Sequence, residues 1–301
     1  MRTQPDHERK VGKVTLRFTN QNKIYWPDDK ITKGDLVNYY SEISSVILPY
    51  LKDRPQSLRR HPNGIDAPSF FQKDQNPDVI PEWVRTEKIF SESNNADINY
   101  LICNDKATLL FMANLGCIEI NPWLSRLGKL ENPDWAVLDL DPLEIDFKEV
   151  VKTALETKLV LAKEGIDCFC KTSGSRGLHI CIPLGAKYEY EISKTFIEVI
   201  ANRVHELLPY ITSLERSPSK RKGKIYLDYL QNRIAQTLTA PYSVRPRPGA
   251  PVSTPLHWSE VNPKLDPSKF TMKTIFHRLD KYGDLWKPLL GKGVNLHKAF
   301  A

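Results

Sequence analysis

The sequence predicts an α+β protein with two lobes, in which mixed and antiparallel central sheets are flanked by helices. Two observations support this fold class. The first 116 residues combine a strand-like run with two helical patterns, and beyond them short apolar runs of strand length alternate with longer helical segments. We expect residues 1–301 to form a single domain, made of an α/β lobe at about 1–125 and a second lobe at about 126–301.

The elements of the first lobe have recognisable start and stop signals. KVTLRFTN (13–20) has the alternation of a strand. KGDLVNYYSEISSVILPYL (33–51) carries an apolar stripe at helical spacing, and Asp35 is its expected cap. DKATLLFMANLG (105–116) is expected to be a helix that its final glycine ends. Residues 52–80 are rich in turn formers and predict irregular structure.

The second lobe alternates strands and helices. Helical segments lie around 147–164 and 191–208, and residues 264–291 predict a helical tail broken by proline. Around them lie five short runs of strand length: CIEINPW, WAVLDLD, CFCKTS, GLHICIPL and KIYLDYL. This pattern predicts a mixed sheet with helices packed on it.

Composition narrows the class of protein. The chain is 41% hydrophobic and its 22 prolines are spread along its length, which is typical of a compact protein and not of a disordered one. No apolar run approaches the roughly 18 residues that span a bilayer, and the charged N-terminus lacks the apolar stretch of a signal peptide. We therefore expect a cytoplasmic protein with no membrane partner. The five cysteines form no CxxC pair and are expected to be buried and reduced.

The distribution of basic residues points to a polyanionic partner. The net charge is +7 at pH 7, and basic residues cluster in SLRRHP (57–62), SKRKGK (219–224) and VRPRP (244–248). A solvated charged surface explains any one cluster alone. Three clusters in separate loops favour a nucleic acid as the partner.

Two carboxylates interrupt the apolar run WAVLDLDPLEI (135–145). Side chains alternate between the faces of a strand, so Asp139 and Asp141 share one face while the leucines beside them point into the core. Two neighbouring like charges repel, and a divalent cation would remove that penalty. Carboxylate oxygens suit Mg²⁺ or Mn²⁺ better than Zn²⁺. The alternative is a solvated strand end without a metal.

A third carboxylate, Asp228, lies in the strand-like run KIYLDYL (224–230). A lone buried aspartate is costly unless it is paired or ligated. Three aspartates on adjacent strands would make a two-metal site, which activates a 3′-hydroxyl and stabilises a leaving pyrophosphate. Between the carboxylate strands lies KTSGSRGLHI (171–180), whose turn offers backbone N–H groups to a phosphate. A simple turn and a structural histidine are the alternative for that stretch.

These motifs, in this order, resemble the archaeo-eukaryotic primase superfamily. The longer stretches DWAVLDLDP, KTSGSRGLHICIPL, and YLDYLQN followed by TAPYSVRPRPGAPVSTPLHW narrow the resemblance to the polymerase domain of bacterial ligase D, which acts in non-homologous end joining. The resemblance extends from about residue 13 to residue 290. It implies a two-lobed primase-polymerase fold and a template-dependent nucleotidyltransferase.

The resemblance implies roles for individual residues. Asp139, Asp141 and Asp228 would be the catalytic residues and the ligands of two Mn²⁺ or Mg²⁺ ions. Relatives commonly have a histidine at the position of Asn121 and often a lysine at that of Arg176; asparagine donates a hydrogen bond but carries no charge. The residues expected to bind the incoming NTP or dNTP are Ser173, Arg176, His179, Gln231, Arg245 and Asn121.

The resemblance also implies two contacts with DNA. TNQNKIYWPDDKITKGD resembles the family's pocket for the 5′-phosphate of a DNA end, with Asn20, Lys23 and Lys33 as donors. LRRHPNGIDAPSFFQK resembles the template-binding segment, in which Phe70 and Phe71 would stack on bases. Core packing of at least one of the two rings is the alternative. Candidate contacts to the template DNA are Arg59, Arg60 and Arg221.

The expected function is therefore gap filling and end extension in non-homologous end joining, by attack of a primer 3′-hydroxyl on a nucleotide, with ribonucleotides preferred. The expected partners are DNA ends with a 5′-phosphate, NTP or dNTP, the end-binding protein Ku, and ligase and nuclease domains on the same or another chain, in the bacterial cytoplasm at the nucleoid.

Two other classes of protein compete with this interpretation. A DxD-type phosphohydrolase usually has Gly or Thr soon after the second aspartate, where this chain continues as DLDPLEI. A non-catalytic module that binds and bridges DNA ends would have a broken carboxylate triad, whereas all three aspartates are present here.

Overall fold

The structure, a computed structural model, describes residues 6–296. These residues form two compact units. Unit 1 contains the described residues up to Trp123 together with Thr239–Val252 and Thr271–Phe276. Unit 2 contains Leu124–Leu238, Ser253–Phe270 and the described residues from His277 onward. Within the described part of the chain, no helix is both long enough and apolar enough to cross a membrane.

Unit 1 combines short antiparallel strands with two helices. The helices α1 (Lys33–Leu51) and α2 (Lys106–Asn114) pack on each other. The strands pair as β1–β2, β3–β4, β7–β8 and the three-stranded sheet β6–β5–β9. Their bounds are β1 His7–Val11, β2 Val14–Phe18, β3 Ile24–Trp26, β4 Ile31–Thr32, β5 Gln56–Arg60, β6 Phe70–Gln72, β7 Thr86–Ser91, β8 Ala96–Leu101 and β9 Cys117–Pro122.

Helix α1 has the expected bounds, but the expected cap was wrong. Thr32 is the N-cap, and its hydroxyl accepts the N–H of Asp35 at 3.1 Å. The Asp35 carboxylate in turn accepts the N–H of Thr32 at 2.8 Å, so Asp35 is the third residue of a capping box. The end of α2 agrees with the prediction, because Gly116 takes a φ of +82° just beyond the C-cap residue.

Some regions are more regular than the sequence suggested, and the tail is less regular. Strands β5 and β6 lie in the expected irregular region 52–80, and the β7–β8 hairpin follows it. In the expected helical tail, α5 (Ile275–Tyr282) is the one α-helix among the described residues. The tail also contains the 3₁₀ turns η3 (Pro267–Lys269) and η4 (Lys287–Leu290). Two further 3₁₀ turns lie before it, η1 (Pro218–Lys220) and η2 (Trp258–Glu260).

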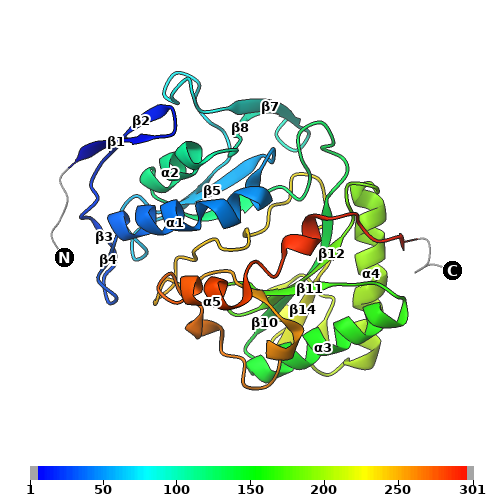
Figure 1. Cartoon of the computed structure of the whole chain (residues 1–301). Coiled ribbons are helices and arrows are strands. Elements are labelled where there is room, and N and C mark those ends of the chain that lie inside the picture. The colour runs from blue at the N-terminus through cyan, green and yellow to red at the C-terminus, as the bar shows by residue number, and fades with distance from the viewer. Residues whose placement is uncertain (1–5, 297–301) are drawn as a thin grey trace. The chain divides into compact units, whose positions relative to one another are not determined.

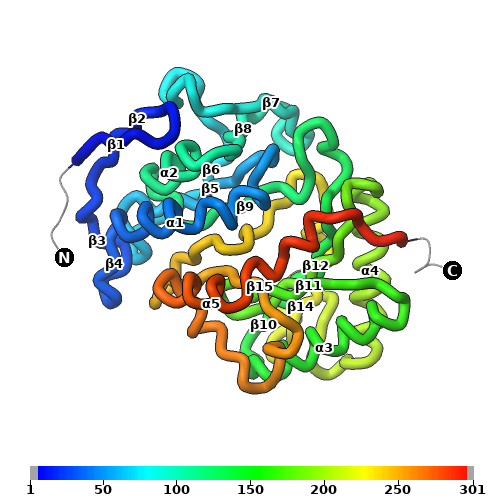
Figure 2. Tube along the Cα trace, viewed as in Figure 1, coloured from blue at the N-terminus to red at the C-terminus, as the bar shows by residue number. Residues whose placement is uncertain are grey.

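Unit 2 is organised around one six-stranded sheet in the order β13–β14–β10–β12–β11–β15. The β13–β14 pair is parallel and the other four pairs are antiparallel, which makes the sheet mixed. In Figure 1, β10, β11, β12 and β14 run beside one another, and Figure 2 shows β15 next to β11. The strands are β10 Trp135–Leu143, β11 Phe169–Thr172, β12 Leu178–Pro183, β13 Thr212–Ser213, β14 Lys224–Asp228 and β15 Pro255–Leu256.

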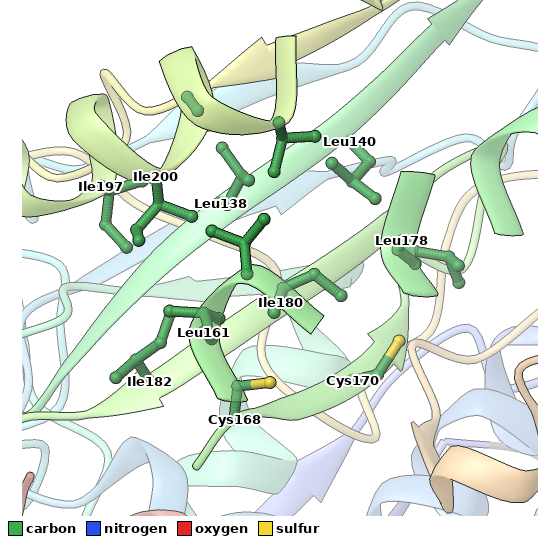
Figure 3. Close-up of a cluster of buried hydrophobic side chains, with 14 of the residues drawn as sticks. Leu138, Leu140, Leu161, Cys168, Cys170, Leu178, Ile180, Ile182, Ile197 and Ile200 are labelled. Atoms are coloured by element: carbon green, nitrogen blue, oxygen red, sulfur yellow. The ribbon is translucent and has the colours of Figure 1, made fainter. Parts of the chain in front are cut away.

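The core of unit 2 lies between one face of this sheet and the helices α3 (Phe147–Lys163) and α4 (Tyr190–Leu207). Figure 3 shows Leu138 and Leu140 of β10 close to side chains of β12 and of both helices, and each of these two leucines is fully buried. Because side chains alternate along a strand, the intervening residues of β10 project from the opposite face. The α+β class, with mixed and antiparallel sheets flanked by helices, is confirmed.

All five cysteines are buried and unpaired, as the absence of a CxxC pair predicted. Burial raises the pKa of the Cys168 thiol to about 12 and, together with the nearby Asp139 carboxylate, also raises that of Cys181 to about 12. The thiols therefore remain protonated at neutral pH and act as apolar packing groups.

Candidate active site and nucleic-acid interface

A row of polar residues crosses the face of the unit 2 sheet that points away from the core. Asp139 on β10 lies directly opposite Asp228 on β14 and, on its other side, opposite His179 on β12. His179 in turn lies opposite Lys171 on β11. Directly opposed residues of antiparallel strands project to the same face, and Asp141 joins them because it lies two residues from Asp139. The structure thus brings the three predicted aspartates to one face.

The carboxylates of β10 are held by two different partners. His179 Nε2 lies 3.4 Å from Asp139 Oδ1, and the histidine side chain is almost fully buried. Arg221 donates to Asp141 Oδ2 at 3.0 Å and to the Asp141 carbonyl at 3.3 Å. The guanidinium carbon of Arg221 lies 4.6 Å from the centre of the Tyr226 ring. Arg221 was expected among the template contacts, and here it is buried against a carboxylate of the candidate active site.

The third carboxylate, on β14, is held by neutral donors. Gln231 Nε2 donates to Asp228 Oδ2 at 3.0 Å, and the backbone N–H of Leu230 donates to Oδ1 at 2.9 Å. Burial, reinforced by the Asp228 carboxylate, raises the pKa of the Tyr226 hydroxyl well above its usual range. Gln231, expected at the nucleotide, therefore lies directly beside the aspartate triad.

The chemistry of this donor set fits a hard divalent cation. Three partly exposed carboxylates share one face, and opposed residues such as Asp139 and Asp228 have Cβ atoms about 4.5–5.5 Å apart. Among residues 6–296, no three His, Cys, Asp or Glu side chains already converge tightly enough to hold an ion. The Asp141 carboxylate is paired with Arg221, whose Nη2 lies 3.0 Å from its Oδ2.

The turn between β11 and β12 converges on a single oxygen atom. The backbone N–H groups of Ser175 and Gly177 both donate to Ser173 Oγ at 3.1 Å, and the N–H of Ser173 donates to the carbonyl of Gly177 at 3.0 Å. Gly174 takes a φ of +70°, which favours glycine. Both N–H groups are bonded to the Ser173 hydroxyl in this structure, so a phosphate oxygen would bind here by replacing that hydroxyl as their acceptor. Arg176, at the tip of the turn, is exposed.

Gly177 is required by a close approach to β10. A Cβ atom on Gly177 would lie 2.1 Å from the backbone carbonyl oxygen of Leu140. Leu140 lies between the two aspartates of β10, so the turn and the carboxylates are packed backbone against backbone. Any larger residue at this position would displace the strand that carries them.

Lys171 is a site residue that the sequence analysis missed. The residue is 1% exposed, and its ammonium lies 2.8 Å from His179 Nδ1 and 2.6 Å from the Ser253 hydroxyl. The signal was present, because Lys171 begins the KTSGSRGLHI motif. Its position opposite His179 depends on the register of β11 against β12, which a single sequence does not show.

Two residues expected at the nucleotide belong to unit 1, where they share neighbours. Asn121 is buried on β9, and its side-chain oxygen accepts the Thr239 hydroxyl at 3.1 Å. Arg245 also donates to the Thr239 hydroxyl oxygen, and its Nε lies 3.4 Å from Glu119 Oε2. Arg59 Nη1 lies 3.3 Å from the same Glu119 oxygen. One carboxylate thus holds two arginines in this part of unit 1.

The predicted 5′-phosphate residues lie in the segment from β2 to α1. Lys33 is 4% exposed, and its ammonium donates to the Thr19 carbonyl at 2.6 Å. Burial, with smaller contributions from Lys23 and Arg60, lowers the pKa of Lys33 to about 8. Lys23 donates to the side-chain oxygen of Asn63, and its carbonyl accepts the N–H of Lys33 at 2.8 Å. The third residue, Asn20, takes a φ of +53° in the turn between the strands.

Both predicted template-stacking rings are on the surface. Phe70 is 47% exposed and Phe71 is 58% exposed, so neither packs in the core. Each ring has an arginine of β5 beside it, because Arg60 lies opposite Phe70 and Arg59 lies opposite Phe71. The distances from guanidinium carbon to ring centre are 5.2 Å and 5.5 Å. Exposed aromatic rings next to cations are the composition of a surface that stacks on bases.

Comparisons with known proteins point to one family. A family model described as "LigD, primase-polymerase domain" matches residues 32–286. The chain is 35% identical over 270 residues to the "Bifunctional non-homologous end joining protein LigD" of Bacillus subtilis, covering 89% of this chain and 43% of that protein. It is 31% identical over 278 residues to the "Multifunctional non-homologous end joining protein LigD" of Mycolicibacterium smegmatis, covering 91% of this chain and 36% of that protein. The chain thus spans about two-fifths of the length of these curated relatives.

A solved structure agrees with the family model. The fold is similar to the "Polymerase Domain from Mycobacterium tuberculosis Ligase D in complex with DNA", with a TM-score of 0.84 and 28% sequence identity. The similarity covers 93% of this chain and 99% of that one.

Proposed function

The chain belongs to the family of LigD primase-polymerase domains, and on that basis we propose that it adds nucleotides to the 3′ end of a primer under the direction of a template. The resemblance found in its motifs is confirmed by this membership. The observation that carries the proposal is the row of opposed residues on the unit 2 sheet, which gathers three carboxylates beside the Ser173 turn. A site that must hold cations and a triphosphate together requires this combination of acidic oxygens and N–H donors.

The proposed chemistry divides the polar face between two tasks. Asp139, Asp141 and Asp228 would hold two divalent cations, Mn²⁺ or Mg²⁺, which would activate the primer 3′-hydroxyl and stabilise the leaving pyrophosphate. The Ser173 turn and the exposed Arg176 would bind the triphosphate oxygens, since N–H groups and a guanidinium are the donors that phosphate prefers.

The Arg221 guanidinium is placed to bind two anions in turn, Asp141 in the free protein and the triphosphate in the complex. In the described structure it is bonded to Asp141 and lies over the Tyr226 ring. If Asp141 held a cation instead, the Arg221 guanidinium would be available to the triphosphate, whose oxygens are strong acceptors. Arg221 would thus neutralise the negative charge of Asp141 in the free protein and that of the nucleotide in the complex.

Unit 1 supplies the proposed contacts with the DNA end. Lys33 and Lys23 would exchange their present carbonyl and amide acceptors for a 5′-phosphate, which is a stronger acceptor. Phe70 and Phe71 would stack on template bases, with Arg59 and Arg60 near the backbone. We further propose that the protein fills gaps and extends ends in non-homologous end joining and prefers ribonucleotides, as the family resemblance implies.

The proposed partners follow from the relatives. Their printed names describe bifunctional and multifunctional end-joining proteins, and this chain matches about two-fifths of their length. We therefore propose that it works with ligase and nuclease functions, on its own chain or another, and with the end-binding protein Ku.

Primer extension across a short gap tests the proposal. The substrate is a gapped duplex with a 5′-phosphate at the downstream end, supplied with Mn²⁺ or Mg²⁺ and with each NTP or dNTP. We expect templated addition by the wild type and a loss of at least about a thousandfold in Asp139→Asn, which keeps the shape but removes a charged ligand. Asp167→Asn, an exposed aspartate of unit 2, is the matched control and should retain full activity.

The alternative functions give different results in the same assay. A non-catalytic bridging module would bind the gapped duplex and hold two DNA ends together in a pull-down. It would add no nucleotide in the presence of Mn²⁺ or Mg²⁺. A phosphohydrolase would release phosphate from a phosphate monoester in an Asp139-dependent reaction. Either result, without templated addition, would exclude the polymerase.

A further inference from the structure

Lys171 is a buried cation with a defined set of partners. Its ammonium lies 2.6 Å from the Ser253 hydroxyl, 2.8 Å from His179 Nδ1 and 5.8 Å from the centre of the Trp286 ring. The ring is itself held by a hydrogen bond from its N–H to the Cys170 carbonyl at 3.0 Å. A cation this deeply buried is costly unless its protons have acceptors. The directions of these hydrogen bonds therefore matter.

The first direction is set by a backbone carbonyl, which can only accept. Ser253 Oγ lies 2.8 Å from the carbonyl oxygen of Thr172, so the single hydroxyl proton is used in that bond. The contact between Ser253 Oγ and Lys171 must then have Lys171 as its donor. An ammonium has three protons and no acceptor, so it satisfies this requirement.

The second direction is set by a carboxylate, which also can only accept when ionised. His179 Nε2 faces Asp139 Oδ1 at 3.4 Å, and a proton on Nε2 is the arrangement that suits this acceptor. On the other side of the ring, Nδ1 faces the Lys171 ammonium and accepts from it. The two ends together place the ring proton of His179 on Nε2.

We propose that Lys171 is a positioning residue that holds His179 in its Nε2–H tautomer. The inference rests on the proposed function, because it assigns a purpose to this tautomer at the same site. The proton then points to the carboxylate face, where it faces Asp139 in the described structure and would face a triphosphate oxygen in the complex. In the other tautomer Nε2 would present a lone pair, which repels phosphate oxygens. Lys171 would thus make a neutral histidine a donor without touching the nucleotide itself.

The first test measures the tautomer and needs no catalysis. The protein is labelled with ¹⁵N-histidine, and the ring resonances are assigned to His179 by comparison with His179→Gln. The wild type should show the proton on Nε2, and Lys171→Met should shift the population toward the Nδ1–H form. A wild-type His179 protonated on Nδ1 would overturn the proposal whether or not any variant folds.

The second test asks whether Lys171 acts through His179. In single-nucleotide addition, Lys171→Met should lower kcat/KM for the nucleotide by roughly tenfold, the scale of one hydrogen bond to a charged group. Most of that loss should lie in KM, and Lys171→Arg, which keeps donors at this position, should restore part of the activity. In the His179→Gln background, the same Lys171→Met change should have little further effect.

The outcomes separate this inference from the proposed function. An equal loss on Lys171→Met in the wild-type and His179→Gln backgrounds would mean that Lys171 has only a structural role. A wild type that adds no nucleotide would refute the polymerase, while the tautomer measurement would still decide whether Lys171 orients His179.

Discussion

The two units hold their charged residues by different means. On the unit 2 sheet, Asp139 has its position set by strand register, and its neighbours across the sheet are themselves polar site residues. In unit 1, Lys33 and Arg60 donate to the backbone carbonyls of Thr19 and Leu115 at 2.6 Å and 2.9 Å. The acidic site is thus built from side chains that depend on one another, whereas Lys33 and Arg60 are each attached to a backbone carbonyl of their own.

This difference predicts how each region responds to damage. A register-determined site fails as a whole, because moving one strand moves every member of the row. Residues anchored one at a time should fail in smaller, separable steps. The three predictions below test this contrast, from the largest expected effect to the smallest.

Gly177→Ala should damage the acidic site most. The new Cβ would meet the Leu140 carbonyl at 2.1 Å, so β10 must shift, and we expect a destabilisation of about 3 kcal/mol together with loss of nucleotide addition. Thermal and urea unfolding would measure the first effect. The control is Gly223→Ala, where φ is +70° but no atom lies within 4 Å of the added Cβ, so about 1–2 kcal/mol of backbone strain is expected. Equal costs for the two variants would contradict the close-packing argument.

Phe70→Ala and Phe71→Ala should each weaken template binding without affecting the fold. Both rings are exposed, and base stacking contributes about 1–3 kcal/mol per ring, which is roughly a five- to 150-fold change in the Kd. Fluorescence anisotropy with a template overhang measures the loss, and a blunt duplex is the control substrate. Exposed Phe90, on β7, provides a matched variant for nonspecific effects of removing an aromatic ring. If Phe90→Ala weakened overhang binding as much, stacking would not be specific to β6.

Recognition of a 5′-phosphate should weaken as the pH rises through about 8. The pKa of Lys33 is lowered to about 8, so its ammonium loses its proton over a range in which an ordinary lysine stays charged. Between about pH 7 and about pH 9 we expect the affinity ratio of 5′-phosphate to 5′-hydroxyl ends to fall by up to roughly tenfold. In the Lys33→Met variant, the affinity ratio of 5′-phosphate to 5′-hydroxyl ends should be low at both pH values. A wild-type ratio independent of pH would show that Lys33 does not supply the charge.

The same lowered pKa has a defined effect on stability. The unfolded chain keeps Lys33 protonated up to its ordinary pKa of 10.5, whereas the folded chain releases the proton near pH 8. The unfolded state therefore binds more protons between these values, and this residue's contribution to folding becomes more favourable as the pH rises across that window.

Sequence patterns were sufficient wherever one periodicity dominated a segment. The alternation in WAVLDLD placed Asp139 and Asp141 on the face opposite the core, and the helical spacing of 33–51 gave both ends of α1. The family resemblance depended on the same stretches. In a buried strand, the residues between the polar positions must be apolar, so the sequence pattern is distinctive. The roles of the individual site residues remain predictions.

Other features depended on contacts between segments distant in sequence. No local sequence pattern indicates the strand register that places Lys171 opposite His179. The same is true of the contact between the Arg221 side chain and Asp141. Strand β6 was missed because it has three residues, two of them adjacent aromatics on opposite faces, after a long turn-rich stretch. The tail was predicted to be helical and broken by proline; it contains α5 and two short 3₁₀ turns that each have a proline at the first or second position.

The buried cysteines have a consequence for oxidation. Peroxides attack the thiolate form, and burial raises the pKa of thiols such as Cys168 to about 12, so the reactive form is scarce at neutral pH. All five thiols of the chain are enclosed in this way. The native protein should therefore keep its thiols through an oxidative exposure, and their modification would report unfolding.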